Sequence, residues 1–491
     1  MRDRAIIVLD VGKTMAKLSL WSASGALIAR ETRPNARIET GHYVALDAGG
    51  IESWMAETLR NFARLADVGA IIPVSHGAAA AIVRGDRLVC PPLDYEEAMP
   101  AGLRRDYDAV RDPFVETGSP ALPDGLNLGA QIYRLQALYP DLLDDGATIM
   151  PWAQYWSWLL CGIAASEITS LGCHSDLWRP IAGAPSALAI AQGWADRLAP
   201  LMAAGTVLGT ITPAWVARTG LPADVRIHCG LHDSNAALLA ARGFPEIAGG
   251  EATVLSTGTW FVAMRSPAPG TPVDIASLPE ARDCLVNIDA FGQPVPSARF
   301  MGGREIETLS GVDTRRIDIR PDQPALVAAV PAVIAAGAMV LPTFAPGFGP
   351  FAHGRGRWIA MPTDQAERRA AVCLYAALVT DAMLALIGTR DRVLVEGRFA
   401  EADVFVRALA ALRPDTAIHV SNAHNDVSYG ALRLLDPSLA PDSRQESDSR
   451  LESDSRLESA SRLERVAPLD VDLADYRAQW QREAERMEMA A

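Results

Sequence analysis

The sequence predicts an α/β protein built from two related lobes. Residues 5–21 have the pattern of a buried apolar strand, a polar turn and a second strand, and residues 254–264 repeat that plan around another glycine. Val254 follows Val8 by 246 residues in a chain of 491, so the two hairpins start half a chain apart. A chain of this length exceeds the size at which one hydrophobic core keeps growing. We therefore expect two lobes that each bring one hairpin to a shared cleft.

The turn of the first hairpin carries groups suited to a metal and a phosphate. Asp10 ends the first strand, where its carboxylate can hold Mg²⁺ directly or through water. Around Gly12, backbone amides can cradle phosphate oxygens, while Lys13 adds a positive charge and Thr14 a hydroxyl. Gly-Lys-Thr also resembles the end of a Walker A loop, but that loop needs a glycine where this chain has Ile7, and a following helix. The residues after the turn alternate as a strand instead.

The second hairpin offers Thr257, Gly258 and Thr259 as further phosphate-binding groups. A strand, a glycine turn and a strand form one of the commonest local patterns in proteins, so either hairpin alone is weak evidence of function. Their repetition at half-chain spacing favours a shared function.

Composition and charge narrow the class of protein. Hydrophobic residues make up 49% and charged residues 21% of the chain, as in an ordinary globular enzyme. The net charge of −14, without a basic block, argues against nucleic acid or an anionic membrane surface as the main partner. We find no leader and no 18-residue apolar span, the longest candidate being 156–165, so a cytoplasmic protein is expected. Six scattered cysteines without a CxxC pair indicate buried reduced thiols.

A second buried strand, over 69–75, delivers His76 and Gly77 to its carboxyl end. Ligand sites of open α/β sheets lie at that end of the strands, which makes both residues candidate substrate contacts. A lone histidine is as often a structural residue, so the two interpretations stay open.

Helical spacing predicts three helices in the first lobe, over 51–66, 127–138 and 151–160. Residues 84–127 are rich in Pro, Gly and acidic side chains and are predicted to be irregular. Trp152 begins an aromatic cluster that either packs in the core or walls a sugar site. Glu167 follows a turn and could present its carboxylate to a ligand.

Residues 223–240 are the most informative segment after the hairpins. A strand reaches Gly230, turns, and opens an Ala/Leu-rich helix with Asp233 in its first turn. One interpretation is that Asp233 only caps that helix. The other is that it acts as the general base for a substrate hydroxyl, with His232 as a neighbouring polar contact.

The second lobe is expected to begin after a hinge at 244–250. A long apolar helix is predicted over 365–387. In residues 393–399 a strand runs into Gly397, where a flat base could approach the backbone. We assign four parts to the chain: a sugar-binding and catalytic lobe over 1–245, a nucleotide-binding lobe over 250–438, a disordered hexad-repeat insertion over 443–465, and a C-terminal helix over 466–491.

Five motifs therefore follow one another along the chain: Asp10-Val-Gly-Lys-Thr14, Ser75-His76-Gly77, Gly230-Leu-His-Asp233, Ser256-Thr-Gly-Thr-Trp260 and Gly397. Together and in this order they resemble the FGGY carbohydrate kinases over about residues 5–435. The Ser-Thr-Gly-Thr-Trp and Gly-x-His-Asp stretches are most similar to the rhamnulokinase and fuculokinase side of that family. The resemblance implies two actin-like (ribonuclease H-like) ATPase lobes, the fold of sugar kinases, Hsp70 and actin.

The resemblance also implies a function: transfer of the ATP γ-phosphate to a hydroxyl of a ketose such as L-rhamnulose, L-fuculose or xylulose. Asp233 would be the base, Asp10 the Mg²⁺ carboxylate and Gly397 the adenosine contact. Thr14 and Thr257 to Thr259 would contact phosphate, and His76 would contact the sugar. The residue patterns described above add Gly12 and Lys13 as phosphate contacts, and Gly77, Trp152, Glu167, His232 and Asp233 as sugar contacts. Two departures from the family leave nucleotide preference and sugar open: Glu396-Gly397 replaces a glycine pair, and Gln-Met is missing before His76.

Two other classes of protein share this fold. A non-catalytic sugar or nucleotide sensor would be favoured by loss of the base or metal position, yet Asp10 and Asp233 are both present. An actin-like or Hsp70-like ATPase leaves His76 and Asp233 without a role. The expected partner is a small sugar, without nucleic acid or membrane; a homodimer is compatible with the sequence, which does not fix the oligomeric state, the sugar or the hydroxyl.

Overall fold

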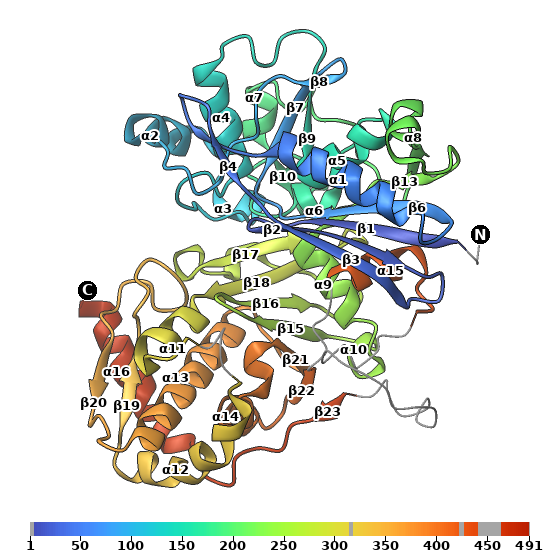
Figure 1. Ribbon diagram of the computed structural model, residues 1–491. Helices are drawn as coiled ribbons and strands as arrows, with labels where there is room; N and C mark the ends of the chain where they lie inside the picture. The colour runs from blue at the N-terminus through green and yellow to red at the C-terminus, as the bar shows by residue number, and fades with distance from the viewer. Residues whose placement is uncertain (1–3, 314–317, 422–426, 440–462, 491) are drawn as a thin grey trace. The chain divides into compact units, whose positions relative to one another are not determined.

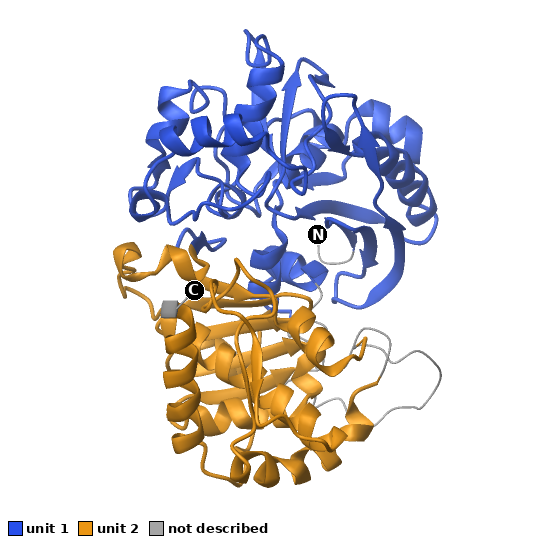
Figure 2. Ribbon diagram, turned by 90° about the vertical axis from the view of Figure 1, so that its left-hand side faces the viewer, with its two compact units in different colours: residues 1–240, 286–294, 426–439 blue, residues 241–285, 295–425, 440–491 orange. Residues whose placement is uncertain are grey.

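A computed structural model describes residues 4–313, 318–421, 427–439 and 463–490. The chain divides into two compact units (Figure 2). Unit 1 comprises residues 1–240, 286–294 and 426–439, and unit 2 comprises residues 241–285, 295–425 and 440–491. The two lobes predicted from the sequence are each continuous, whereas unit 1 also includes two short segments, 286–294 and 426–439, from the later part of the chain.

The first hairpin forms the centre of the sheet in unit 1. This sheet has the order β12-β13-β6-β1-β2-β3, with β14 paired to β6. Its strands are β1 (Ala5–Val11), β2 (Met15–Trp21), β3 (Leu27–Pro34), β6 (Val68–Ser75), β12 (Val207–Thr210), β13 (Arg226–His228) and β14 (Leu231–His232). β1 runs antiparallel to β2 and parallel to β6. The predicted strand–turn–strand of 5–21 is thus the central hairpin.

Helices cover both faces of this sheet (Figure 1). On one face, α1 (Ala48–Phe62), α5 (Trp152–Cys161) and α8 (Pro213–Thr219) pack against the inward side chains of β1, such as Ile7 and Leu9. On the other face, α9 (Asp233–Ala241) and α15 (Val427–Leu435) pack against Val8. Alternate residues of β1 therefore enter two separate cores, as expected for a strand buried on both faces.

A second cluster of elements completes unit 1. Its core contains Tyr107, Trp194 and Ile288. The elements are β4 (Arg37–Glu39), β5 (Val44–Leu46), β7 (Ala80–Arg84), β8 (Arg87–Leu88), β9 (Ala147–Pro151), β10 (Trp178–Arg179), β11 (Ala184–Pro185), α2 (Ala101–Val110), α3 (Phe114–Thr117), α4 (Leu128–Leu138), α6 (Ile168–Leu171) and α7 (Ala187–Ala191). Residues 84–127, predicted to be irregular, contain α2, of whose residues only Tyr107 is buried. A helix that buries so little gives a weak apolar pattern in the sequence.

Unit 2 repeats the strand arrangement of unit 1. Its sheet has the order β17-β18-β16-β15-β21-β22-β23. The strands are β15 (Ala252–Thr257), β16 (Phe261–Ser266), β17 (Cys284–Ile288), β18 (Pro294–Phe300), β21 (Arg392–Gly397), β22 (Ala417–Ser421) and β23 (Glu464–Arg465). Residues 286–288 of β17 and Pro294 of β18 are counted with unit 1. β15 runs antiparallel to β16 and parallel to β21, as β1 does to β2 and β6. The expected echo of the first hairpin is therefore a central hairpin as well.

The long apolar helix α13 (Gln365–Leu386) lies in the core of unit 2. It packs against α11 (Gly302–Ser310), α12 (Gln323–Ala335) and α14 (Asp403–Leu412). It is long and apolar enough to cross a membrane by length and composition alone, which corrects our expectation that no such window exists. However, 72% of that window is buried inside the fold, as in the core helix of a globular protein. The other elements of unit 2 are α10 (Pro245–Ala248), α11 (Gly302–Ser310), α12 (Gln323–Ala335), α14 (Asp403–Leu412), α16 (Ala474–Ala490), β19 (Met339–Leu341), β20 (Arg357–Ile359) and the 3₁₀ helices 275–277, 280–282, 320–322 and 398–401.

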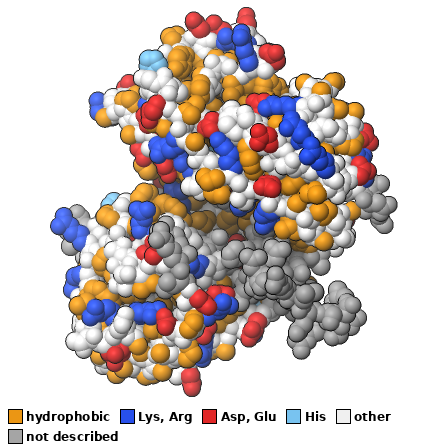
Figure 3. Space-filling view, in the orientation of Figure 1, with side chains coloured by type: hydrophobic (Ala, Val, Ile, Leu, Met, Phe, Trp, Pro, Cys, Tyr) orange, Lys and Arg blue, Asp and Glu red, His pale blue; other side chains and the backbone are white. Residues whose placement is uncertain are grey.

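The C-terminal stretch belongs to unit 2. α16 buries Tyr476, Trp480 and Ala484, and the indole of Trp480 donates a hydrogen bond to the carbonyl of Val340 at 2.7 Å. Most of the predicted hexad-repeat insertion, 443–465, lies outside the described residues; its last two residues form β23. In the view of Figure 3, Lys and Arg side chains lie beside Asp and Glu side chains on both units.

Candidate active site

The carboxyl ends of three neighbouring strands of unit 1 bring the predicted polar residues together. Asp10 of β1 stands opposite Val74 of β6, and Ser75 at the end of β6 stands opposite His232 of β14. The chain reaches β14 through Gly230, which has φ +83° and where a Cβ atom would lie 2.2 Å from the carbonyl oxygen of Pro73. Only glycine fits this close approach, and it turns the chain so that Asp233 opens α9 at the same edge.

Asp233 is partly buried, with 29% of its side-chain surface exposed. Its Oδ1 accepts hydrogen bonds from the backbone amide of Ser234 at 2.6 Å and from the hydroxyl of Ser234 at 3.2 Å. Burial raises the pKa of Asp233 to about 6, and those two hydrogen bonds together with the charge of Lys17 oppose the shift. Asp233 thus combines a place in the first turn of α9 with a carboxylate whose pKa lies close to neutral, which is the range of a general base.

Asp10 lies at the end of β1 with 7% of its side chain exposed, and its Oδ2 is 3.1 Å from the ammonium group of Lys17. The two residues face each other across the β1–β2 pair. A buried carboxylate needs such a partner, because isolated burial of its charge is costly. Lys17 was not among the predicted site residues, although as one of only two lysines in the chain it was visible in the sequence.

Lys13, predicted to contact phosphate, is engaged within unit 1. Its ammonium group forms an ion pair with Asp94, lies 3.7 Å from Glu96 and sits 4.5 Å from the centre of the Tyr95 ring. Arg37 binds the other oxygen of Asp94 at 2.9 Å. The charge of Lys13 is therefore balanced by the 94–96 loop, and the structure favours a structural role for it.

The predicted phosphate turn at 12–14 is held by a residue that the sequence analysis missed. The amide of Gly12 donates to the carbonyl of Met15 at 3.0 Å, which closes the turn. The side chain of Asn35 donates to the carbonyl of Gly12, and its backbone amide donates to the carbonyl of Thr14, each at 2.8 Å. Thr14 is exposed. Asn35 acts from the far end of β3, so no local pattern could reveal it.

His76 is buried at the end of β6, and neither ring nitrogen has a hydrogen-bond partner among the described residues. Its ring packs edge-on against Tyr95 at a centroid distance of 5.6 Å. Burial, with the positive charge of Lys13, lowers the pKa of His76 to about 3, so the ring is neutral at physiological pH. A buried polar group without a partner is costly, and a ligand hydroxyl would satisfy it. At Gly77, a Cβ atom would lie 3.0 Å from the His232 ring.

Trp152 lies in the hydrophobic core of unit 1, with 1% of its surface exposed. Its ring stacks on Tyr155 at 5.0 Å and packs edge-on against Trp156 at 4.8 Å. Of the two interpretations of the aromatic cluster, this placement favours packing.

Glu167 is fully buried as the N-cap of α6. Its Oε2 accepts hydrogen bonds from the amide of Thr169 at 3.0 Å, the hydroxyl of Thr169 at 2.5 Å and the amide of Ser170 at 3.3 Å. Burial raises the pKa of Glu167 to about 7 despite these donors. Glu167 therefore stabilises the first turn of α6 and holds the hydroxyl of Thr169. Its side chain is not exposed to a ligand in the structure.

The buried carboxyl of Glu167 should make stability depend on pH. Its pKa is raised from an ordinary 4.5, so between pH 4.5 and 7 the folded chain keeps a proton that the unfolded chain has released, and stability falls as pH rises. Glu167→Gln removes this titration. We compare the free energy of unfolding of Glu167→Gln with that of the unchanged protein. The difference, variant minus unchanged protein, should rise by roughly 2 kcal/mol from pH 5 to pH 8. Urea denaturation at both pH values measures this difference, and a difference independent of pH would contradict it.

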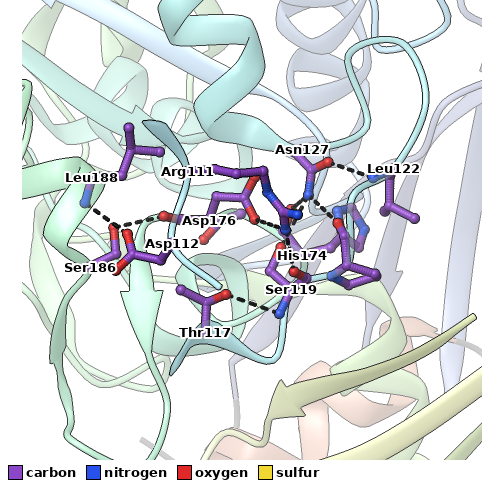
Figure 4. A network of polar contacts seen from close by, with 12 residues as sticks. Arg111, Asp112, Thr117, Ser119, Leu122, Asn127, His174, Asp176, Ser186 and Leu188 are labelled. Atoms are coloured by element: carbon purple, nitrogen blue, oxygen red, sulfur yellow. Dashed lines mark hydrogen bonds and ion pairs between the residues drawn. The ribbon is translucent and has the colours of Figure 1, made fainter. Parts of the chain in front are cut away.

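A buried polar network fixes residues 173–176, which follow α6 in the chain (Figure 4). Asp176 accepts hydrogen bonds from Tyr107 and from Arg111, at 2.5 and 3.2 Å. The side-chain amide of Asn127 donates to the carbonyl of His174 at 3.1 Å and accepts from the amide of Leu122 at 2.9 Å. His174 and Asp176 both have positive φ, +35° and +62°. The network thus holds residues 173–176 in a conformation that non-glycine residues adopt rarely.

In unit 2, a hydrogen bond from the glycine amide also closes the turn of the second hairpin, which is one residue shorter than the first turn. The amide of Gly258 donates to the carbonyl of Trp260 at 3.0 Å. The hydroxyl of Thr257 is already used: it donates to the carbonyl of Glu396 at 2.6 Å and accepts from the amide of Phe399 at 3.1 Å. Gly258 and Thr259 are exposed. The exposed turn, rather than the Thr257 side chain, is therefore the part that can meet a phosphate.

Two further glycines pack against that turn. At Gly303, in the first turn of α11, a Cβ atom would lie 2.0 Å from the carbonyl oxygen of Gly258, so α11 begins directly beside the turn. Gly397 has φ +84°, and a Cβ there would lie 2.5 Å from the carbonyl oxygen of Thr257. The sequence predicts a base near Gly397; in the structure, the approach of β15 and the positive φ are enough to require glycine there.

Comparisons with known proteins agree with this arrangement. Residues 249–444 match the family model of the carbohydrate kinase FGGY C-terminal domain. The L-fuculokinase of Salmonella typhi is 26% identical over 278 residues, which cover 54% of this chain and only 57% of that protein. The crystal structure of a carbohydrate kinase from Novosphingobium aromaticivorans is 56% identical, with 99% of each chain covered and a TM-score of 0.91.

A xylulose kinase from Rhodospirillum rubrum, 16% identical with 99% and 98% of the two chains covered, has a TM-score of 0.73 and shows the shared fold. The predicted actin-like fold is thereby confirmed. The order of the motifs agrees with the match to the FGGY C-terminal domain and with the carbohydrate kinase from Novosphingobium aromaticivorans, which aligns over 99% of each chain. This chain belongs to the FGGY family of carbohydrate kinases.

Proposed function

We propose that this protein transfers the γ-phosphate of ATP to a hydroxyl of a ketose such as L-rhamnulose, L-fuculose or xylulose, with Asp233 as the general base. The observation that carries the proposal is the convergence of Asp10, His76, His232 and Asp233 at the carboxyl ends of β1, β6 and β14. Such an edge is where open α/β sheets bind ligands.

Asp233 takes the proton of the attacking sugar hydroxyl. As the hydroxyl oxygen forms its bond to the γ-phosphorus, the bond between that phosphorus and the β–γ bridging oxygen breaks, and ADP leaves. Phosphoryl transfer depends mainly on positioning and on neutralisation of charge, with a carboxylate to accept the proton. His76 supports the positioning, because its two ring nitrogens are buried without partners in the described chain and can bond sugar hydroxyls.

Asp10 would hold Mg²⁺. Within the described residues no group of three or more His, Cys, Asp and Glu side chains could form a metal cage. A single buried carboxylate fits Mg²⁺, which proteins often bind through one or two carboxylates together with substrate phosphates and water. When bound, the ion neutralises charge on the transferred phosphoryl group. Lys17 then balances Asp10 in the absence of the ion, since the two side chains already form an ion pair.

Unit 2 would bind the nucleotide. Gly258 and Thr259 offer exposed backbone and hydroxyl groups to phosphate, and the N-terminus of α11 lies beside them at Gly303. Helix N-termini favour anions, because their first amides are unpaired and the helix dipole is positive there. Gly397, at the end of β21, remains the proposed adenosine contact. Unit 1 would then carry the sugar and the base.

The choice of sugar is open to a direct experiment. Release of ADP from ATP and Mg²⁺ should depend on one or a few members of a panel that includes L-rhamnulose, L-fuculose, D- and L-xylulose and D-ribulose. Release that is equally fast without sugar would instead indicate an ATPase. No response to this panel or to other polyols would contradict the kinase proposal and favour a sensor.

The rate should fall in acid because Asp233 must be unprotonated to accept a proton. Its pKa is about 6, above the ordinary 3.8, so kcat/KM should fall about tenfold per pH unit below pH 6. Initial rates between pH 5 and 8, with ATP and Mg²⁺ saturating at each pH, measure this limb. A profile that stays flat to pH 5 would argue against Asp233 as the base.

A further inference from the structure

His232 lies between two residues that fix its protonation and its orientation. We propose that His232 is a positioning residue for Asp233: Asn235 holds the imidazole with its single proton on Nε2, and that proton is donated to Oδ1 of Asp233, which leaves Oδ2 as the atom that accepts the substrate proton. The inference rests on the proposed function, in which Asp233 is the base.

The hydrogen-bond partners of the ring determine where its proton lies. The side-chain nitrogen of Asn235 is 3.3 Å from Nδ1 of His232. An amide nitrogen can only donate, so Nδ1 accepts, and the proton of a neutral ring is then on Nε2. Nε2 has two polar neighbours: Oδ1 of Asp233 at 3.1 Å and Sγ of Cys173 at 3.6 Å. The carboxylate is the nearer and stronger acceptor, because a thiol donates and accepts only weakly. If the Asn235 amide were reversed, its oxygen would face Nδ1, and the ring proton would lie on Nδ1. The lone pair of Nε2 would then point at the carboxylate of Asp233, which is repulsive.

The ring acts as a neutral donor and not as a cation. His232 is 5% exposed, and burial lowers its pKa to about 4. A protonated imidazole beside Asp233 would stabilise the carboxylate strongly and weaken it as a base. A neutral N–H orients the carboxylate without adding a full charge. Lys17 is then the charged group that acts on Asp233 from β2.

The two carboxylate oxygens of Asp233 have different surroundings. Oδ1 receives three donors: the amide of Ser234, the hydroxyl of Ser234 and Nε2 of His232. Oδ2 has no hydrogen bond or ion pair within the described residues. An oxygen with three donors is a poor proton acceptor, because each bond stabilises its charge. The arrangement therefore directs the proton to Oδ2.

The backbone of His232 is anchored from the opposite side. Its amide donates to Oγ1 of Thr169 at 2.9 Å, and the single hydroxyl hydrogen of Thr169 is donated to Glu167 at 2.5 Å. Both Thr169 and Glu167 are fully buried. Gly77 lies against the ring, where even a Cβ atom would come within 3.0 Å of Nε2. Glu167, Thr169 and Gly77 thus fix the position of the ring that orients the base.

The two amide replacements of His232 form a matched pair. A glutamine amide nitrogen reaches the position of Nε2, whereas an asparagine amide reaches only that of Nδ1. We expect His232→Gln to keep kcat within about threefold of the unchanged protein. His232→Asn should lose 10- to 100-fold in kcat, the scale of a misplaced catalytic group, with the KM for sugar changed less than threefold. In His232→Asn the acid limb of kcat/KM should also move to higher pH, because the Asp233 carboxylate has lost a donor.

Equal kcat values for His232→Gln and His232→Asn, at equal thermal stability, would overturn the proposal. A purely structural role for His232 would instead lower the melting temperature of both variants without moving the pH limb. If His232→Asn does not fold, Asn235→Ala takes its place, since it leaves the imidazole but removes the group that selects its tautomer; a kcat unchanged from that of the intact protein would then overturn the proposal.

Nitrogen-15 NMR of histidine-labelled protein tests the tautomer without any activity. The chain has eight histidines, and the His232 signals are those absent from His232→Gln. We expect a protonated Nε2 and an unprotonated Nδ1 at pH 7; a proton on Nδ1 would overturn the inference. If the unchanged protein phosphorylates no sugar, the proposed function fails, and this spectrum still decides how His232 is held.

Discussion

Asp233→Asn is expected to lower kcat for the preferred sugar at least about 100-fold, the usual contribution of a general base. The substitution keeps the shape of the side chain, and its Oδ1 can still accept from Ser234, whose amide donates to Asp233 at 2.6 Å. An amide has no basic oxygen comparable to a carboxylate, so proton transfer alone is removed. The dissociation constants of ATP and sugar should change little, and calorimetric titration measures both.

Asp47→Asn is the matched control. Asp47 caps α1 in the same unit, accepts from the amide of Gly50 at 2.8 Å and pairs with Arg33 at 2.7 Å. Asparagine caps helices about as well as aspartate, so this variant should fold and keep its kcat. Near-normal turnover of Asp233→Asn, or an equal loss in Asp47→Asn, would contradict the assignment of the base.

Local sequence patterns predicted the elements that carry the site. The hairpins at 5–21 and 254–264 are the central hairpins of the two sheets. The helices predicted over 365–387 and 151–160 are α13 and α5. Strands buried on both faces are short apolar runs, and their glycine turns interrupt those runs sharply, so period and punctuation are both visible in one sequence.

Contacts between distant residues could not be predicted in this way. Lys13 pairs with Asp94, and Thr169 bonds the backbone of His232; no spacing rule links such positions. Gly397 shows a related limit, because the sequence revealed the glycine but not whether a ligand or the chain itself approached it. Sequence patterns thus predicted which strand ends carry polar groups, while the pairing of those groups depended on tertiary packing.

The position of Asp233 also depends on how α9 packs against α15. α9 begins at Asp233. α15 packs against α9 in the core of unit 1 that contains Val8. At Gly430 of α15, a Cβ atom would lie 1.7 Å from the carbonyl oxygen of Ala236 in α9. Backbone atoms of two helices meet at this point, so no change of side-chain rotamer could make room for a methyl group.

Gly430→Ala should therefore destabilise the fold by about 3 kcal/mol, the upper range for overpacked cores, and should lower kcat because α9 must move. The matched control is Gly102→Ala in α2, where the nearest atom to a new Cβ is in Arg105 at 3.9 Å. There alanine should stabilise the helix by about 0.5–1 kcal/mol and leave kcat unchanged. Urea denaturation followed by tryptophan fluorescence measures both variants. Equal denaturation midpoints would show that α9 and α15 can separate at little cost, and the base would then owe its position to His232 and Ser234 alone.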